Sequence, residues 1–298
     1  MTDLVATIVS NPSRPALTDA LLARLAQVLP LAGAPVRLDD GLVAADLRLA
    51  QGPDSAAACE ALRTACSDAP VDVIVQPAAT RRKALFLADM DSTIIGQECI
   101  DELADFVGLK DRVSAITERA MRGELAFEPA LRERVALLAG LDVAVVDRIV
   151  AERLTLTPGG AMLVRTMRAQ GGYTALVSGG FTLFTGPVAA LIGFDEHRSN
   201  LLVVEDGRLA GQVAEPILGR EAKRAALLEL RERLGVPAMA TLAVGDGAND
   251  LAMLAEAGLG VAFRAKPAVA AAAHARLDHA DLTALLYAQG YRRADFAA

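Results

Sequence analysis

The chain has 298 residues, 53% hydrophobic and 22% charged, so it can bury a sizeable core, which a disordered chain cannot. Its formal net charge is −7 and it contains no tryptophan, so we expect neither the basic surface nor the stacking platforms of a nucleic-acid-binding protein. The length suits two domains better than one.

The sequence pattern of residues 1–80 predicts a small α+β unit. Apolar periodicity indicates four strands and two helices in the order β-α-β-β-α-β, which is the ferredoxin-like arrangement. The segments, in chain order, are 4–10, 17–29, 36–40, 42–50, 55–66 and 71–77. Residues 81–83, Arg-Arg-Lys, form a charged joint to the next unit. The chain begins without the basic leader and long apolar run of a signal peptide, so we expect a cytoplasmic protein.

Three continuous apolar runs predict a parallel sheet in the second unit, residues 81–298. They lie at 84–89, 173–180 and 240–247, and each ends in polar or glycine residues. Strands that are apolar on both faces suit a sheet covered by helices, and ligands bind at the carboxyl ends of such strands. We therefore expect a doubly wound, Rossmann-like α/β core. The uncharged stretch 169–194 contains glycines and Pro187, so we interpret it as a buried strand, a turn and a short helix rather than a membrane span.

The segment between the first two core strands is too long for a crossover loop. We predict that residues 96–157 form a helical cap over the ends of the core strands. The expected helices are 98–107, 110–122, 128–139 and 142–154. A hairpin is predicted at 201–211, turning at Asp206–Gly207.

Asp89 and Asp91 are the first candidates for chemistry, because they follow a buried strand directly. Two carboxylates so close together are costly unless a cation or a proton compensates them. A metal beside Asp89 would keep it ionised as a nucleophile, while Asp91, partly protonated, could act as an acid. Phosphoryl transfer through an acyl phosphate needs that division of roles. The alternative is a polar turn at a helix start.

The run Gly245 to Asp250, Gly-Asp-Gly-Ala-Asn-Asp, is the second candidate. Its glycines permit a tight turn, and Asp246 and Asp250 offer oxygens to a divalent cation, with Asn249 as a neutral neighbour. The three histidines and three cysteines show no zinc-site spacing, so carboxylates must supply most ligands of any metal. This favours a hard ion such as Mg²⁺. A plain Asp-Gly loop is the alternative.

Two weaker candidates could bind a phosphate. The hydroxyl of Ser178 and the backbone of Gly179 and Gly180 could form an anion nest, although Ser-Gly-Gly is also a common turn. Lys223 could pair with a phosphate as a point charge, although a helix lysine is usually solvated.

Together and in this order, these four elements resemble the haloacid dehalogenase-like hydrolase superfamily. Its pattern is D-x-D-x-T after the first strand, Ser or Thr after the second, a lysine on a later helix, and then paired aspartates. All are present, over about residues 84–290. The stretches at 89–104, 120–140, 177–182, 208–211, 243–263 and 265–267 look like the phosphoserine phosphatase family within it.

This resemblance implies a role for each candidate. Asp89 would be the nucleophile and Asp91 the acid and base, while Ser178 and Lys223 would bind the phosphate. Metal ligands would come from Asp89, the backbone carbonyl of Asp91, and Asp246, with Asp250 close by. The remaining predicted substrate contacts are Glu98 at the ammonium, Arg134 at the carboxylate, an apolar lid of Met121 and Phe127, and the polar loop residues Gly179, Gly180 and Asn249.

The resemblance further implies Mg²⁺-dependent hydrolysis of O-phospho-L-serine through an aspartyl phosphate, the last step of serine biosynthesis. Open alternatives are a related small-metabolite phosphatase or phosphotransferase, for instance one acting on phosphohomoserine, and a non-catalytic phosphate-sensing regulator. Residues 1–80 are similar to ACT modules in strand order, which predicts a regulatory or dimerising domain and a possible homodimer. The expected partner is a small-molecule substrate, with no nucleic acid and no membrane.

Overall fold

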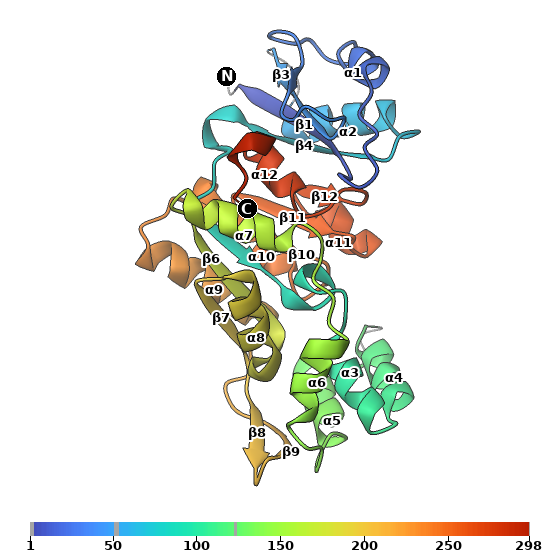
Figure 1. Cartoon of the computed structure of the whole chain (residues 1–298), viewed down its shortest axis with the longest axis vertical. Helices are drawn as coiled ribbons and strands as arrows, with labels where there is room; N and C mark the ends of the chain where they lie inside the picture. Colours follow the sequence, from blue (N-terminus) through green and yellow to red (C-terminus); the bar gives the residue numbers. More distant parts are fainter. Residues whose placement is uncertain (1–2, 51–53, 122–123, 298) are drawn as a thin grey trace.

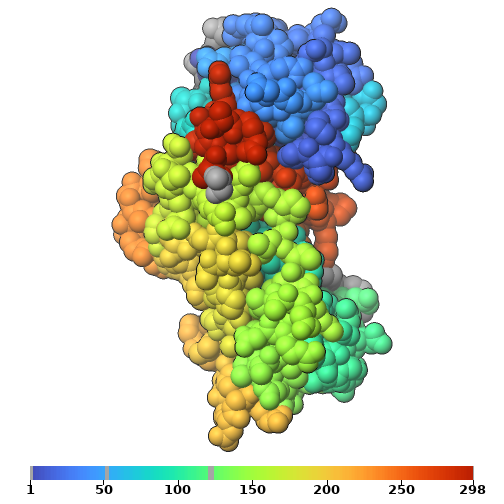
Figure 2. Space-filling view, in the orientation of Figure 1, coloured from blue at the N-terminus to red at the C-terminus, as the bar shows by residue number. Residues whose placement is uncertain are grey.

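The structure of the protein, a computed structural model, describes residues 3–50, 54–121 and 124–297, with the backbone alone at 120 and 121. An N-terminal unit lies at one end, a sheet core in the middle, and a helical cap beside a hairpin at the other end (Figure 1). In the space-filling view, the C-terminal segment, red, lies directly against the N-terminal unit, blue (Figure 2).

The N-terminal unit is a four-stranded antiparallel sheet in the order β2-β3-β1-β4, which confirms the ferredoxin-like prediction. Its elements are β1 (Leu4–Ser10), α1 (Asp19–Leu25), β2 (Val36–Arg37), β3 (Ala44–Leu49), α2 (Ser55–Ala65) and β4 (Val71–Pro77). The prediction that the first helix extends over 17–29 was wrong. Thr18 caps α1 at its start, and the helix ends before Leu29, which precedes Pro30 and therefore disfavours the helical conformation.

The two faces of this sheet contact different parts of the molecule. Ala45 and Leu47 point to α1 and α2 and form a core with them. Ala44 and Ile74 point the other way and belong to the main core, which includes α12 (Ala284–Ala288). The side chain of Gln76 donates to the backbone carbonyl of Ala288 at 2.8 Å. The N-terminal unit is thus packed on the C-terminal helix, as Figure 1 shows.

A six-stranded parallel sheet in the order β12-β11-β10-β5-β6-β7 forms the core, as predicted. On one face it packs against α7 (Gly160–Ala169), α8 (Thr182–Ile192) and α12, and on the other against α9 (Arg220–Arg233), α10 (Leu251–Glu256) and α11 (Pro267–Ala272). The strands are β5 (Leu85–Ala88), β6 (Tyr173–Phe181), β7 (Glu196–Asn200), β10 (Thr241–Gly245), β11 (Leu259–Phe263) and β12 (Ala275–Leu277). Phe86 and Leu87 of β5 show why both faces are apolar, since successive side chains enter opposite cores.

The uncharged stretch 169–194 forms β6 and α8, as expected. Among the residues described, no helix combines the length and the apolar character needed to cross a membrane. Short single turns lie at Ala78–Thr80, Ala238–Ala240 and Arg293–Asp295.

The cap consists of α3 (Cys99–Phe106), α4 (Lys110–Met121), α5 (Phe127–Ala136) and α6 (Val145–Glu152). Its two connections to the core run side by side, with the Gly96 N–H donating to the Thr155 carbonyl at 3.0 Å and the Thr157 N–H to the Ile94 carbonyl at 2.9 Å. The hairpin predicted at 201–211 is present as β8 (Leu202–Glu205) and β9 (Arg208–Val213). Backbone hydrogen bonds between Leu209 and the cap residues Gly140 and Leu141 tie it to the cap.

Candidate active site

Asp89 directly follows β5, at the carboxyl end of a central strand, and only 4% of its surface is exposed. The next residues, Met90–Ile94, form a tight turn closed by a hydrogen bond from the Ile95 N–H to the Met90 carbonyl at 3.0 Å. Within it Ser92 has φ +56°, a left-handed conformation that non-glycine residues seldom adopt. The side chain of Ser92 donates to Glu98 at 2.6 Å, which holds the turn against the start of the cap.

Lys223 joins two carboxylates in the interior. Its Nζ lies 2.6 Å from Asp89 Oδ1 and 2.7 Å from Asp250 Oδ1, and both Lys223 and Asp250 have 0% exposure. Burial alone would lower the pKa of Lys223, but the charges of Asp250 and Asp89 outweigh it and the pKa is raised. Lys223 is therefore a permanent cation in the site, not the solvated helix lysine that its local sequence suggests.

Asp246 completes a group of three carboxylates. Ligand atoms of Asp89, Asp246 and Asp250 all lie within 4.8 Å of one another, and Thr93 Oγ1 donates to Asp246 at 3.3 Å. Burial and the charge of Asp250 raise the pKa of Asp246 to about 6. Burial and the same neighbour raise the pKa of Asp89 well above its usual range. One lysine does not neutralise three carboxylates, so the group suits a hard divalent cation that binds oxygen.

Asp91 follows Asp89 by two residues and is half-buried. Its Oδ1 accepts the backbone N–H of Cys99 at 3.2 Å. Burial and the charge of Glu98 raise the pKa of Asp91 to about 7, so this carboxyl can both hold and release a proton near neutral pH. A Cβ at position 180 would come within 2.9 Å of Asp91 Oδ2, which explains the glycine there.

Ser178, Gly179 and Gly180 lie in the last residues of β6, where pairing with β7 becomes irregular. They are thus in a distorted strand end rather than a free turn. The Ser178 hydroxyl accepts the Gly180 N–H at 2.9 Å. Gly247, in the loop that carries Asn249, would place a Cβ 2.2 Å from Asn249 Oδ1, so only glycine allows this loop to fold so tightly.

Sequence reasoning missed Asn200. This side chain is 1% exposed, donates to the carbonyls of Gly179 and Leu218 at 2.8 and 3.2 Å, and accepts the Leu218 N–H at 2.6 Å. It thereby joins the end of β6, which contains Ser178 and Gly179, to the loop before α9. Helix α9 carries Lys223. A single asparagine at the end of a strand offers no sequence signal for this role, which only its burial and hydrogen bonds in the structure show.

The cap brings Phe127 onto the core, and it places Arg134 close enough to Glu98 for the two charges to interact. A Cβ at Gly179 or Gly219 would lie 3.5 or 3.3 Å from the ring of Phe127, so this ring packs on both glycines. Arg134 is half-buried and donates to Thr117 Oγ1 and to the Ala130 carbonyl, both at 3.2 Å. In the part of the chain that is described, it has no carboxylate in ion-pairing distance. Glu98 is exposed at the start of α3; Met121, the other predicted lid residue, lies outside the side chains described.

These residues form a site suited to phosphoryl transfer. A buried carboxylate, Asp89, is oriented by a cation, and a carboxyl with a pKa near neutrality, Asp91, lies two residues away. Backbone N–H groups and a hydroxyl lie at the neighbouring strand end. Such sites act mainly by positioning groups and by stabilising charge.

Comparison with known proteins agrees with this geometry. Residues 86–255 match the family model described as haloacid dehalogenase-like hydrolase. A protein named phosphoserine phosphatase from Streptomyces coelicolor is 40% identical over 294 residues, which are 98% of this chain and 72% of that protein. The similarity therefore includes the N-terminal unit.

Solved structures show the same fold. A haloacid dehalogenase family hydrolase from Salmonella enterica serovar Typhi superposes with a TM-score of 0.84 at 29% identity, covering 96% of this chain and 97% of that one. A structure described as a phospho-aspartyl intermediate analogue of phosphoserine phosphatase superposes with a TM-score of 0.64 at 38% identity. The superposition covers 69% of this chain and 98% of that one. The chain belongs to the haloacid dehalogenase-like hydrolases, and within them to the phosphoserine phosphatase family of phosphoric monoester hydrolases.

Proposed function

We propose that this enzyme hydrolyses O-phospho-L-serine to L-serine and inorganic phosphate, with Mg²⁺ as its cofactor. The observation that carries the proposal is the pairing of buried Asp89 with Lys223, beside Asp91 and beneath a cap that presents Arg134. The substrate named for the 40% identical relative supports it. The reaction would belong to serine biosynthesis, in the cytoplasm.

In the first step, an Asp89 carboxylate oxygen attacks phosphorus in line with the leaving seryl oxygen. The bond from phosphorus to that oxygen breaks, and its electron pair stays on the oxygen. Asp91 gives its proton to that oxygen, and serine leaves. The pKa of Asp91, about 7, suits this proton transfer because the acid is available at neutral pH without holding its proton too tightly. Asp89 becomes an aspartyl phosphate.

In the second step, Asp91 is a carboxylate and takes a proton from water. The water oxygen bonds to phosphorus, and the bond to the Asp89 oxygen breaks. Lys223, held between Asp89 and Asp250, keeps Asp89 in place in both steps and offsets phosphate charge. Ser178 and the Gly179–Gly180 backbone would contact the phosphate oxygens.

Mg²⁺ would be held by Asp89, Asp246, Asp250 and the backbone carbonyl of Asp91, with Asn249 beside them. Three carboxylates within 4.8 Å of one another supply the hard oxygen donors that it prefers. Bound there, it would keep these carboxylates ionised and offset the charge of the phosphate.

The cap would select the amino-acid part of the substrate. Arg134, without an ion pair among the described residues, is placed to bind a carboxylate with two parallel hydrogen bonds, and Glu98 would accept the ammonium. Phe127, already packed on Gly179, would form the apolar lid, with Met121 as its predicted partner.

The test is release of phosphate from phosphoserine, with Mg²⁺ and with a chelator, by the wild type and by Asp89→Asn. We expect Mg²⁺-dependent turnover in the wild type and at least a thousand-fold loss in the variant, which keeps the size of the side chain but loses the nucleophile. Preference for phosphohomoserine would point to a related phosphatase instead. Tight binding of phosphate without turnover would point to a sensor, and full activity of Asp89→Asn would exclude the covalent route.

A further inference from the structure

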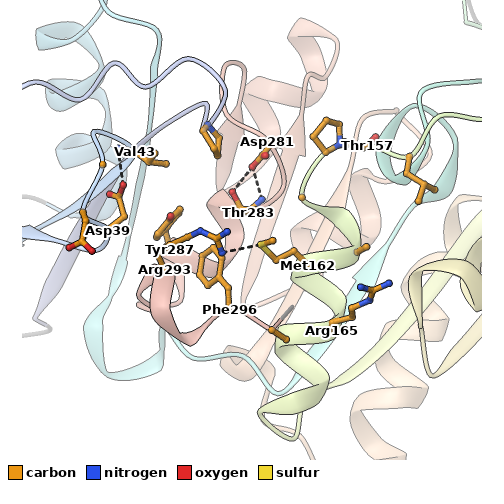
Figure 3. A pocket seen from close by; sticks show the side chains of 18 residues that line it. Asp39, Val43, Thr157, Met162, Arg165, Asp281, Thr283, Tyr287, Arg293 and Phe296 are labelled. Atoms are coloured by element: carbon orange, nitrogen blue, oxygen red, sulfur yellow. Dashed lines mark hydrogen bonds between the residues drawn. The ribbon is translucent and has the colours of Figure 1, made fainter.

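A cavity of about 630 Å³ lies where the N-terminal unit meets the core, and none of its 18 lining residues belongs to the candidate active site (Figure 3). Asp39 and Val43 come from the hairpin between β2 and β3, Met162 from α7, and Tyr287 from α12. Residues 156–159, the return from the cap to the core, form another side. Its size is typical of pockets for small organic molecules.

Two hydrogen-bond donors line this cavity without a carboxylate partner among the described residues: the buried Tyr287 and the exposed Arg293. Tyr287 is 2% exposed, and its hydroxyl has no hydrogen-bond partner in the ranges that the structure describes. Burial and the charge of Asp39 raise the pKa of Tyr287 to about 12, so the hydroxyl keeps its proton and remains a donor. A hydroxyl that lines the cavity and has no partner among the described residues is free to donate to a ligand acceptor.

Arg293 is the second donor. Its Nη1 reaches only the sulfur of Met162, at 3.4 Å, and its guanidinium lies over the ring of Phe296, 5.1 Å from the centroid. No carboxylate lies in ion-pairing distance of Arg293 within the described ranges. Arg293 is close enough to Tyr287 to affect its titration, and the two side chains lie side by side in Figure 3. A cation beside a neutral donor is a site for a carboxylate.

An acceptor lies across the same cavity. Asp281 is 8% exposed, and its Oδ1 accepts both the N–H and the hydroxyl of Thr283. Its second oxygen, Oδ2, has no hydrogen bond to any residue described, which leaves it available to an ammonium group. Asp39 and Asp40 also line the cavity, and Asp39 is close enough to Tyr287 to raise its pKa, so a purely anionic ligand would be repelled.

The walls between these charges are apolar, formed by Val43, Met162 and Phe296 together with Pro158. We propose that this cavity binds a free amino acid with a large apolar side chain. Its carboxylate would meet Tyr287 and Arg293, its ammonium would meet Asp281, and its side chain would lie against the apolar walls. A second site of this kind does not depend on the reaction proposed above.

L-Tryptophan is a suitable probe because the chain contains no tryptophan, so indole emission excited at long wavelength comes from the ligand alone. We expect a saturable rise in its anisotropy when full-length protein is added, and a matching rise in melting temperature. Tryptamine, which lacks the carboxylate, and indole-3-propionate, which lacks the ammonium, should each bind at least about ten-fold more weakly. Equal binding of either analogue, or no binding of L-tryptophan, would overturn the proposal.

Three variants locate the site. Tyr287→Phe keeps the ring and removes the hydroxyl, and Arg293→Gln removes the charge, so each should weaken binding of L-tryptophan about ten-fold. The neighbouring Arg292→Gln lies outside this cavity and should bind like the wild type. Arg134→Ala, in the cap, should also bind like the wild type. If Arg134→Ala abolishes binding while Tyr287→Phe and Arg293→Gln do not, the ligand occupies the active site and the proposal is wrong.

Discussion

In the absence of a ligand, Lys223 and the carboxylates around it fix the arrangement of the candidate active site. Two fully or nearly buried carboxylates share this lysine, and a third, Asp246, lies beside them. Buried ion pairs add little net stability when complete, but removing one partner leaves an uncompensated charge in the interior. The residues that are suited to catalysis are therefore also those whose substitution endangers the fold.

Lys223→Met should destabilise the protein without metal by about 3–5 kcal/mol at neutral pH, because Asp89 and Asp250 lose their shared cation. The loss should shrink as the pH falls, since a protonated carboxyl no longer needs that cation. Urea denaturation at two pH values measures both effects. Arg224→Met, on the same helix as Lys223, removes a partly exposed pair with Glu256 of α10 and should cost at most about 1 kcal/mol. Equal losses in the two variants would contradict the role given to Lys223.

Stability should also depend on pH in the wild type. The pKa values of Asp91 and Asp246 are raised to about 7 and about 6, so the folded state holds protons that the unfolded state has released. Above the unfolded pKa, the stability that these groups contribute therefore falls as the pH rises, until both folded pKa values are passed. Mg²⁺ needs ionised carboxylates, so the rise in melting temperature that it causes should be larger at pH 8 than at pH 5.5.

Thermal melts with Mg²⁺ and with a chelator at both pH values test this. Asp246→Asn should reduce the Mg²⁺-dependent rise in melting temperature at both pH values. A rise that is larger at pH 5.5 would show that these carboxylates do not hold the ion.

At the scale of elements, the cap is connected to the core at more places than its two chain connections. The hairpin β8–β9 bonds to Gly140 and Leu141 of the cap, and Arg132 of α5 pairs with Glu215 beyond the hairpin. Asn200 at the end of β7 holds the strand-end segment and the loop before α9 together. The residues proposed to contact the phosphate thus depend on packing among separate elements, whereas Arg134, proposed to bind the substrate carboxylate, lies on α5 of the cap.

Arg134→Ala should raise KM for phosphoserine strongly, by an amount equivalent to about 2–5 kcal/mol, since a buried charge pair with the substrate carboxylate is lost. An aryl phosphate, which lacks that carboxylate, should be affected much less. Steady-state kinetics on the two substrates measure the difference. The exposed neighbour Arg132 provides the matched control, Arg132→Ala. Equal losses on both substrates would assign Arg134 to the fold or to the phosphate.

At the scale of the whole molecule, the charged joint at 81–83 is part of the packing rather than a free linker. Arg81 pairs with Asp46 at 2.8 Å, Arg82 lies over the ring of Tyr291, and Lys83 donates to the carbonyls of Thr80 and Met239. One face of the N-terminal sheet shares a core with α12. Residues 1–80 thus contribute to the packing of the core, and their dimerising or regulatory role stays a prediction.

Removing residues 1–80 should expose the apolar face of α12 and lower the urea midpoint of the remaining chain. Ile74→Ala in the full chain tests the same contact and should cost about 2–5 kcal/mol. Light scattering should show whether the mass in solution changes with the truncation, as a dimerising unit requires. An unchanged midpoint in both proteins would mean that the shared core contributes no stability.

The local pattern of apolar and polar residues was sufficient to predict the strands, the helices and their order. The three apolar runs predicted the sheet, and β-α-β-β-α-β predicted the N-terminal unit, because burial on one or both faces leaves a period in the sequence. Asp89 and Asp91 stood out because they follow such a run, and the family resemblance supplied roles for residues such as Arg134. Tertiary structure alone decided that Lys223 is buried between two aspartates, that Asn200 joins two loops, and that Tyr287 faces a cavity with Arg293. These partners come from distant segments, and sequence periodicity reports which face of an element is buried but not what lies against it.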